Sequence, residues 1–400
     1  MENLIPYIKL IILALACLVT GVCTLSRKWY VNLPVFLICI AGETFMAYLF
    51  FPAYALWPAC GSVAIFAFST AWEHLKPSGR KENKSPIRLP VISGVPYRHL
   101  EFYYYYSNFL VYGGAGSGKT KSIGKWLLEE YIRLGFAGFI YDFKDVDYTQ
   151  TAYNLTKKYG YPHKFYYVSF DKPERSYRFN PLKVVKDRTE LMQLMEDVLL
   201  ALLPKGEKQN EWVAGGLGIL RGVAFRFWDE FPEYCTLPHI MAFIMTASTR
   251  QLSIFLQQNL VAEMMAGAYL KAEGSEKTQA SYLSTLCNNL STISQNEEIA
   301  YILSGDDFDF NLIDPEDPKL FAISNNFSKN SVYAPVIGML MSISTRQFTM
   351  QNKVPFVYFL DEMTTVNIKN FETLPSVLRE YKVGFVLLTQ SGAKLEALYG

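Results

Sequence analysis

The hydrophobic positions divide the chain into a highly apolar front and a mixed remainder. Three apolar runs, at residues 10–25, 33–50 and 55–72, are each long enough to span the hydrocarbon of a bilayer once their flanks are counted. A cleaved signal peptide explains the first run poorly, because its start is not basic and two more apolar runs follow it. We therefore predict that residues 1–72 form a transmembrane region of three helices.

Basic residues set the expected orientation of this region. Arg27 and Lys28 follow the first run, and the stretch after residue 72 is rich in Lys and Arg. By the positive-inside rule both segments face the cytoplasm, so the N-terminus lies outside and the rest of the chain lies inside. Pro52 and Pro58 interrupt the second and third runs, which could form a hairpin. The sequence therefore leaves open whether the chain crosses the membrane two or three times. Glu43 falls within the second run, where an ionised carboxylate would cost ~2.5–3.5 kcal/mol, so we expect a protonated packing role or a functional one.

Residues 73–98 combine prolines, glycines and an excess of basic side chains, which predicts a juxtamembrane linker. Its basic cluster most simply faces anionic membrane lipid, and contact with nucleic acid is the alternative. The four tyrosines at residues 103–106 predict a strand packed on a neighbouring sheet. The alternative is that their rings offer stacking faces to bases.

Beyond the linker, short apolar runs alternate with helical patterns. Residues 108–112, 138–142, 164–168, 320–324, 356–360 and 385–389 have the length and composition of buried strands, and residues 122–134 and 334–351 have helical periodicity. This alternation predicts an α/β fold with a mostly parallel sheet, built in two parts from residues 99–185 and 313–400. Residues 186–312 contain only helical patterns, which predicts an all-helical domain inserted into the sheet domain.

Charge and cysteine usage exclude some function classes. The chain has 38 basic and 37 acidic residues, and only three basic and two acidic ones lie in the apolar front, so the remainder is neutral overall. A nucleic-acid partner therefore requires a local basic patch. The six cysteines and four histidines show no metal-ligand spacing, which makes a zinc site or a disulfide framework improbable.

The sequence GGAGSGKT carries the clearest chemistry. It comprises Gly113, Gly114, Ala115, Gly116, Ser117, Gly118, Lys119 and Thr120 and fits the phosphate-loop pattern. Backbone N–H groups of such a loop converge on phosphate oxygens, Lys119 reaches the β and γ phosphates, and the Thr120 hydroxyl ligates Mg²⁺. The loop follows a predicted strand and precedes a predicted helix, so ATP and Mg²⁺ are the expected cofactors.

Four further polar residues lie at or near strand ends. Asp361 and Glu362 end the apolar run FVYFLDE, where an Asp can hold Mg²⁺ through its water and a Glu can polarise the attacking water. Gln390 ends the next predicted strand, which we expect to lie beside the first strand of the sheet, residues 108–112. Its side-chain amide could sense the γ-phosphate. The alternative is a solvent-exposed glutamine at a strand end. Arg379 could supply a cation to a neighbouring subunit's phosphates, or form a surface salt bridge.

Taken in order, these features resemble the coupling-protein ATPases of type IV secretion and conjugation systems. The resemblance rests on GGAGSGKT, YDFKD (residues 141–145), FNPL (179–182), the helical insertion, VYFLDE and REYKVGFVLLTQSGAKLEALYG. It implies a RecA-like ATPase that forms hexamers at the bacterial inner membrane, with the helical insertion facing the cytoplasm. It assigns Lys119, Thr120 and Asp361 to nucleotide and metal, and Glu362, Arg379 and Gln390 to catalysis. Relatives usually have glycine where this chain has Lys382, and they continue beyond the strand that ends near Gln390.

The resemblance also implies a function and partners. Such a protein uses ATP to pass a relaxosome, with single-stranded DNA attached to protein, or an effector protein into the secretion channel. The expected partners are channel components, relaxase or effector proteins with their adaptors, and membrane lipid. The alternatives are a docking platform that nucleotide only regulates, or a septal-type DNA translocase. The sequence leaves open whether the cargo is DNA or protein.

Overall fold

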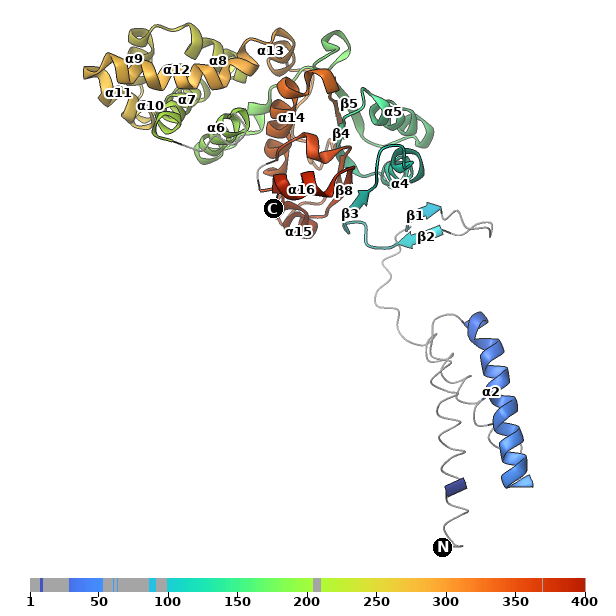
Figure 1. The fold of residues 1–400 in the computed structure, drawn as a ribbon. Helices are drawn as coiled ribbons and strands as arrows, with labels where there is room; N and C mark the ends of the chain where they lie inside the picture. Colours follow the sequence, from blue (N-terminus) through green and yellow to red (C-terminus); the bar gives the residue numbers. More distant parts are fainter. Residues whose placement is uncertain are drawn as a thin grey trace. The chain divides into compact units, whose positions relative to one another are not determined.

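The computed structural model describes residues 8–9, 29–52, 60, 63, 86–90, 99–203, 210–368 and 370–399, without the side chains of residues 29–36 and 292. The chain forms two compact units, residues 1–84 and residues 85–400 (Figure 1).

In the first unit, helix α2 spans Trp29–Phe50 and contains the second apolar run. Glu43 is buried on this helix, as is Ala47 one turn further on. Among the helices that the structure describes, none is both long enough and apolar enough to cross a membrane. The first and third apolar runs lie outside the described residues, apart from Cys60 and Val63. The transmembrane region therefore stays a prediction.

The second unit is built around a parallel sheet of six strands. In chain order they are β3 (Phe109–Tyr112), β4 (Ala137–Asp142), β5 (Lys164–Ser169), β6 (Lys319–Ser324), β7 (Phe356–Leu360) and β8 (Val383–Thr389). Their order across the sheet is β3-β8-β7-β4-β6-β5, and every neighbouring pair is parallel. All six predicted strands are present with shifts of two residues at most. The predicted α/β fold with a parallel sheet is confirmed.

Alternating side chains give this sheet two buried faces, as parallel sheets require. On β4, Ile140 joins a core with helices α4 (Lys125–Arg133) and α5 (Asp147–Tyr159), whereas Phe139 and Tyr141 join the opposite core. That opposite core contains helix α14 (Asn330–Thr345), which begins earlier and ends earlier than predicted. The carboxyl ends of all six strands meet at one edge of the sheet.

The helical insertion follows the prediction in element type. Its helices are α6 (Arg188–Leu202), α7 (Glu211–Glu230), α8 (Leu237–Thr246), α9 (Thr249–Gln257), α10 (Leu260–Met265), α11 (Gly267–Lys271), α12 (Glu276–Ser294) and α13 (Glu297–Leu303). Side chains of Asp187, Asn210, Thr236 and Ser248 accept a backbone N–H in the first turn of α6, α7, α8 and α9, which fixes where those helices begin. The described part of residues 186–312 contains no strand.

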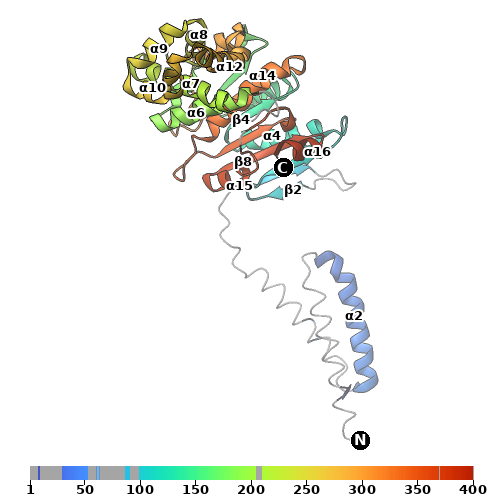
Figure 2. The same cartoon turned by 60° about the vertical axis from the view of Figure 1, so that its left-hand side comes forward.

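The insertion packs against α14, the helix that covers one face of the sheet (Figures 1 and 2). Phe179 joins the two parts, because its ring lies 5.0 Å from Phe308, 4.8 Å from Phe310 and 5.7 Å from Phe321 on β6. One continuous apolar core therefore runs from the sheet into the helices.

The prediction of a strand at residues 103–106 is wrong. These residues form a turn after β2 (His99–Phe102), which pairs in antiparallel fashion with β1 (Ile87–Pro90), a strand within the predicted linker. Tyr105 is buried, its ring 5.8 Å from Phe136, and its carbonyl accepts a hydrogen bond from the Tyr131 hydroxyl. Tyr103 and Tyr104 are exposed. Tyr106 is partly buried beside Tyr105, with its ring 6.0 Å from Phe136, so the packing of two adjacent tyrosines on one phenylalanine prevails over strand propensity.

Candidate functional site

The phosphate loop connects β3 to a π-helical turn, Thr120–Gly124, which leads into α4. Gly116 and Gly118 have φ angles of +73° and +83°, a left-handed conformation that glycine adopts without a steric penalty. A Cβ on Gly113 would lie 2.7 Å from the Ser117 hydroxyl oxygen. These positions explain why the motif requires glycine. The π-helical turn replaces the first turn of the helix predicted from residue 122.

Lys119 folds back on its own loop. Its ammonium group donates hydrogen bonds to the carbonyl oxygens of Gly113 and Gly114, the latter at 3.1 Å. Charged phosphate oxygens accept stronger hydrogen bonds from an ammonium group than carbonyl oxygens do. A nucleotide phosphate entering the loop would therefore displace these two contacts.

Asp361 lies just beyond the carboxyl end of β7 and is 3% exposed. Its Oδ2 atom is buried and has no hydrogen-bond partner among the described residues. Burial is the main reason why the pKa of Asp361 is raised to about 7. The positive charge of Lys144 lowers this pKa, and the negative charges of Asp142 and Glu362 raise it. An unpartnered carboxylate oxygen in a buried position is a suitable ligand for Mg²⁺ or for one of its waters, so the residues present fit the predicted metal.

Glu362 follows in a left-handed conformation, with φ of +46°. Its Oε1 atom accepts hydrogen bonds from the backbone N–H of Gln390 and from the Thr364 hydroxyl, both at 3.2 Å. Strand β8 lies between β3 and β7, so the expected adjacency of the Gln390 strand is confirmed. The phosphate loop is attached to the same strand, because the Gly113 N–H donates to the Thr389 carbonyl at 3.3 Å.

Comparison with known proteins places this arrangement in a family. The model of the type IV secretory system conjugative DNA transfer family matches residues 79–400. The chain belongs to this family. This match favours a conjugative coupling protein over a septal-type DNA translocase, which was one of the alternatives left open by the sequence. No curated protein matches the chain in sequence.

Several solved structures with a similar fold are of conjugative coupling proteins. The bacterial conjugative coupling protein TrwBdeltaN70, in a trigonal form with sulphate, has a TM-score of 0.59 and 18% identity over 79% of this chain and 70% of its own. The plasmid coupling protein TrwB with ADP and Mg²⁺ has a TM-score of 0.56 and 18% identity over 73% of this chain and 65% of its own. TrwB with a non-hydrolysable ATP analogue gives a TM-score of 0.56 at 19% identity. At this identity the likeness shows the fold.

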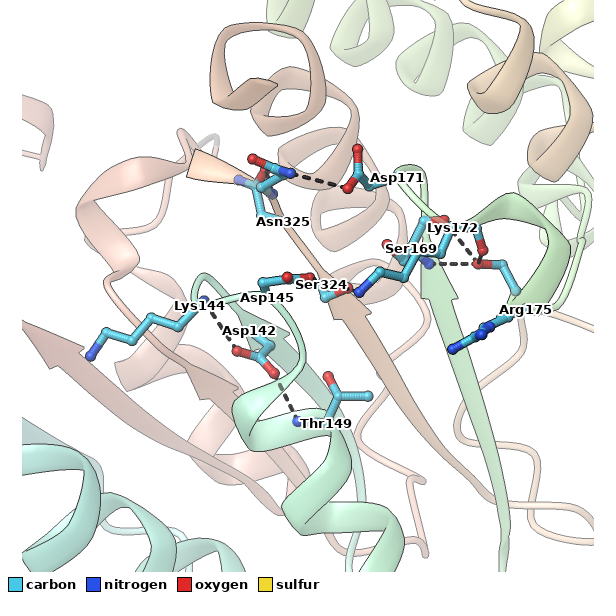
Figure 3. A network of polar contacts seen from close by, with 12 residues as sticks. Asp142, Lys144, Asp145, Thr149, Ser169, Asp171, Lys172, Arg175, Ser324 and Asn325 are labelled. Atoms are coloured by element: carbon cyan, nitrogen blue, oxygen red, sulfur yellow. Dashed lines mark hydrogen bonds and ion pairs between the residues drawn. The ribbon is translucent and has the colours of Figure 1, made fainter. Parts of the chain in front are cut away.

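In this member of the conjugative DNA transfer family, two site residues escaped the sequence prediction. Asp142, fully buried at the end of β4, accepts hydrogen bonds from the backbone N–H groups of Thr149 at 2.8 Å and Lys144 at 3.2 Å (Figure 3). Lys144 extends its ammonium group to 3.4 Å from the Thr120 hydroxyl. Burial raises the pKa of Asp142. The available signal was a carboxylate ending the apolar run GFIYD, the same pattern that identified Asp361.

Arg379 is not brought to the site of its own chain. It is exposed in a short 3-10 turn, Leu378–Tyr381, that precedes the amino end of β8, whereas the phosphate loop lies at the carboxyl ends of the strands. A contact with the phosphates of another subunit stays a prediction. Lys382, which stands where relatives usually have glycine, has a φ of +65°. This left-handed conformation is the physical reason why glycine suits the position.

Proposed function

We propose that the chain binds Mg·ATP, hydrolyses it, and uses the energy to drive the substrate of a conjugative transfer system into the secretion channel. One observation carries the proposal: the phosphate loop and Asp361, whose buried Oδ2 atom has no hydrogen-bond partner among the described residues, belong to one polar cluster. Lys144 connects them, since it contacts Thr120 and its charge lowers the pKa of Asp361. Nucleotide-bound structures of TrwB, a protein of the same fold, support ATP and Mg²⁺ as cofactors.

Each side chain has a role in this proposal. Lys119 and the loop N–H groups hold the phosphates, while Thr120 and Asp361 hold Mg²⁺, which would neutralise the developing phosphate charge. Glu362 orients the attacking water and accepts its proton. Gln390, whose N–H already holds Glu362, reports the state of the phosphate to β8 and its neighbours.

We further propose that the protein works at the bacterial inner membrane as a homo-hexamer, with the second unit in the cytoplasm. The apolar composition of residues 1–72 supports the membrane anchor. The position of Arg379, distant from its own phosphate loop and exposed, supports a role across a subunit interface. In this arrangement Arg379 stabilises charge on the nucleotide of a neighbouring subunit.

Steady-state ATP hydrolysis by the purified full-length protein tests the proposal. Lys119→Ala should lose nucleotide binding and turnover, whereas Lys121→Ala, a matched change of an exposed lysine beside the loop, should retain both. Single-stranded DNA should stimulate the wild type. Equal turnover in Lys119→Ala and wild type would refute the ATPase assignment.

The second candidate function is a docking platform whose assembly is regulated by nucleotide. It is favoured by exposed apolar side chains at the far end of the insertion, where Ile254, Leu260 and Met264 are 47%, 71% and 69% exposed. Such a surface suits a protein partner. Glu362→Gln separates the two candidates, because a platform that only needs bound ATP would still support transfer between cells, whereas an ATP-driven translocator would not.

A further inference from the structure

Two adjoining hollows lie along one edge of the sheet. Strand β5 is last in the strand order, and the hollows beside it have volumes of about 410 and 720 Å³. Both hollows are lined by Tyr153 on α5, Phe165 on β5 and Tyr177 beyond β5. We call this feature the edge groove.

Two tyrosine rings in the edge groove are accessible and held in place. Tyr153 and Tyr177 are 48% and 44% exposed. The Tyr153 ring lies 6.0 Å from Phe165 and carries the Lys157 ammonium group 5.3 Å from its centroid, over one face. The Tyr177 ring packs edge-on against Tyr166 at 5.1 Å. Rings that are fixed by neighbours while keeping a free surface are suitable platforms for stacking a base, because little side-chain entropy is lost on binding.

The lining of the edge groove is basic. Lys172 and Arg175 line the first hollow, and Lys157 and Lys164 line the second, where Asp307 is the acidic member. Lys172 and Lys164 also form ion pairs, at 3.2 and 3.3 Å, with Asp145 and Asp317, which lie outside the lining. Arg175 and Glu174 are largely exposed and 3.9 Å apart. Phosphates would compete with these carboxylates for Lys164, Lys172 and Arg175, whereas Lys157 has no carboxylate partner among the described residues.

The edge groove also adjoins the nucleotide site. Asp145, the ion-pair partner of Lys172 (Figure 3), has a φ angle of +45°, and Val146, which lines the first hollow, has a φ angle of +72°. Such angles are strained for residues other than glycine, above all for β-branched valine. The strained pair directly follows Lys144, which contacts Thr120 of the phosphate loop. A phosphate that took Lys172 away from Asp145 would act on this segment.

We propose that the edge groove binds single-stranded DNA, with bases stacked on Tyr153 and Tyr177 and phosphates on the surrounding Lys and Arg side chains. The inference rests on the proposed function and names a surface that the substrate contacts. An extended peptide added to the sheet is the competing occupant. The structure disfavours it, since the edge of β5 is already taken at Tyr167, whose carbonyl accepts the Tyr177 N–H at 3.0 Å, and at Ser169, whose N–H donates to the Ser176 hydroxyl at 2.8 Å.

Fluorescence anisotropy with a labelled oligothymidine and the full-length protein tests the proposal. Because alanine replacement of a stacked aromatic weakens binding by ~1–3 kcal/mol per base, Tyr153→Ala and Tyr177→Ala should each raise the Kd about 5-fold to 150-fold. Tyr153→Phe and Tyr177→Phe keep the ring and should bind like the wild type. Tyr234→Ala removes a tyrosine that is 55% exposed on the helical insertion and serves as the matched control.

A second readout protects the test against a folding artefact. Basal ATP turnover without DNA should be unchanged in Tyr153→Ala and Tyr177→Ala, while stimulation by oligothymidine should fall with the loss of affinity. Wild-type DNA affinity in both Tyr153→Ala and Tyr177→Ala would overturn the inference. If these two variants bound DNA normally but failed to capture a protein partner, the edge groove would be a peptide site instead. A wild type that hydrolyses ATP yet binds no oligothymidine would overturn the inference while leaving the ATPase assignment intact.

Discussion

Glu362→Gln isolates the chemical step of the proposed hydrolysis. The substitution keeps the Oε1 atom that accepts hydrogen bonds from the Gln390 N–H and the Thr364 hydroxyl, each at 3.2 Å in the wild type. The shape of the side chain and these two contacts therefore persist, and both folding and nucleotide binding should survive. The variant loses only a carboxylate that can take a proton from water.

The expected magnitude follows from general-base catalysis. Removing a positioned base lowers the rate by about 10² to 10⁴, which corresponds to a barrier increase of about 3 to 5 kcal/mol. Single-turnover hydrolysis of labelled ATP at saturating Mg²⁺ measures the step, and titration of a fluorescent nucleotide measures affinity. We expect the affinity to remain within a few-fold of the wild type.

A matched change at the opposite end of the strands controls for the loss of a negative charge. Glu380 is exposed in the turn before β8, and Glu380→Gln should leave the single-turnover rate unchanged. If Glu362→Gln hydrolyses ATP within about threefold of the wild-type rate while Lys119→Ala is inactive, the base is another group. The assignment of Glu362 would then be wrong.

Three further predictions concern backbone and core. Gly118→Ala places a Cβ at a φ of +83° and should abolish nucleotide binding, whereas Gly114→Ala, which meets nothing within 4 Å and has no positive φ, should be far milder in a nucleotide titration. Phe179→Ala removes a fully buried ring between sheet and insertion and should lower the free energy of unfolding by ~3–5 kcal/mol in urea denaturation; a loss below ~1 kcal/mol would contradict the joint core. Lys382→Gly relieves a left-handed backbone and should raise the free energy of unfolding by up to ~1 kcal/mol, and a destabilised variant would contradict this explanation.

The sequence predicted the sheet, and it named most residues of the candidate site, because both depend on local patterns. Short apolar runs determine buried strands, and the glycine spacing of the phosphate loop determines a backbone that only glycine adopts freely. Asp361 and Glu362 became candidates because the chain places this carboxylate pair after an apolar strand downstream of a phosphate loop; alone, an acidic pair at a strand end is a common surface feature. The parallel order then brought them beside the Gln390 strand.

What the sequence did not predict depends on contacts between distant segments. The tyrosines at residues 103–106 have strand propensity, yet the fit of Tyr105 against Phe136 and the Tyr131 hydroxyl determines a turn. Lys144 entered the site only through its approach to Thr120 across two loops. The edge groove likewise joins α5, β5 and the segment after β5, and no single stretch of sequence contains its pattern.

The central claim is that one metal-bound nucleotide lies between the phosphate loop and Asp361. Crystals of the protein with a non-hydrolysable ATP analogue and Mn²⁺ in place of Mg²⁺ test it through the anomalous signal of manganese. We predict a peak about 2 Å from the Thr120 hydroxyl oxygen, with Asp361 in direct contact or one water away and the β and γ phosphates on Lys119. A manganese peak remote from Asp361, or phosphates bound away from Lys119, would contradict the account.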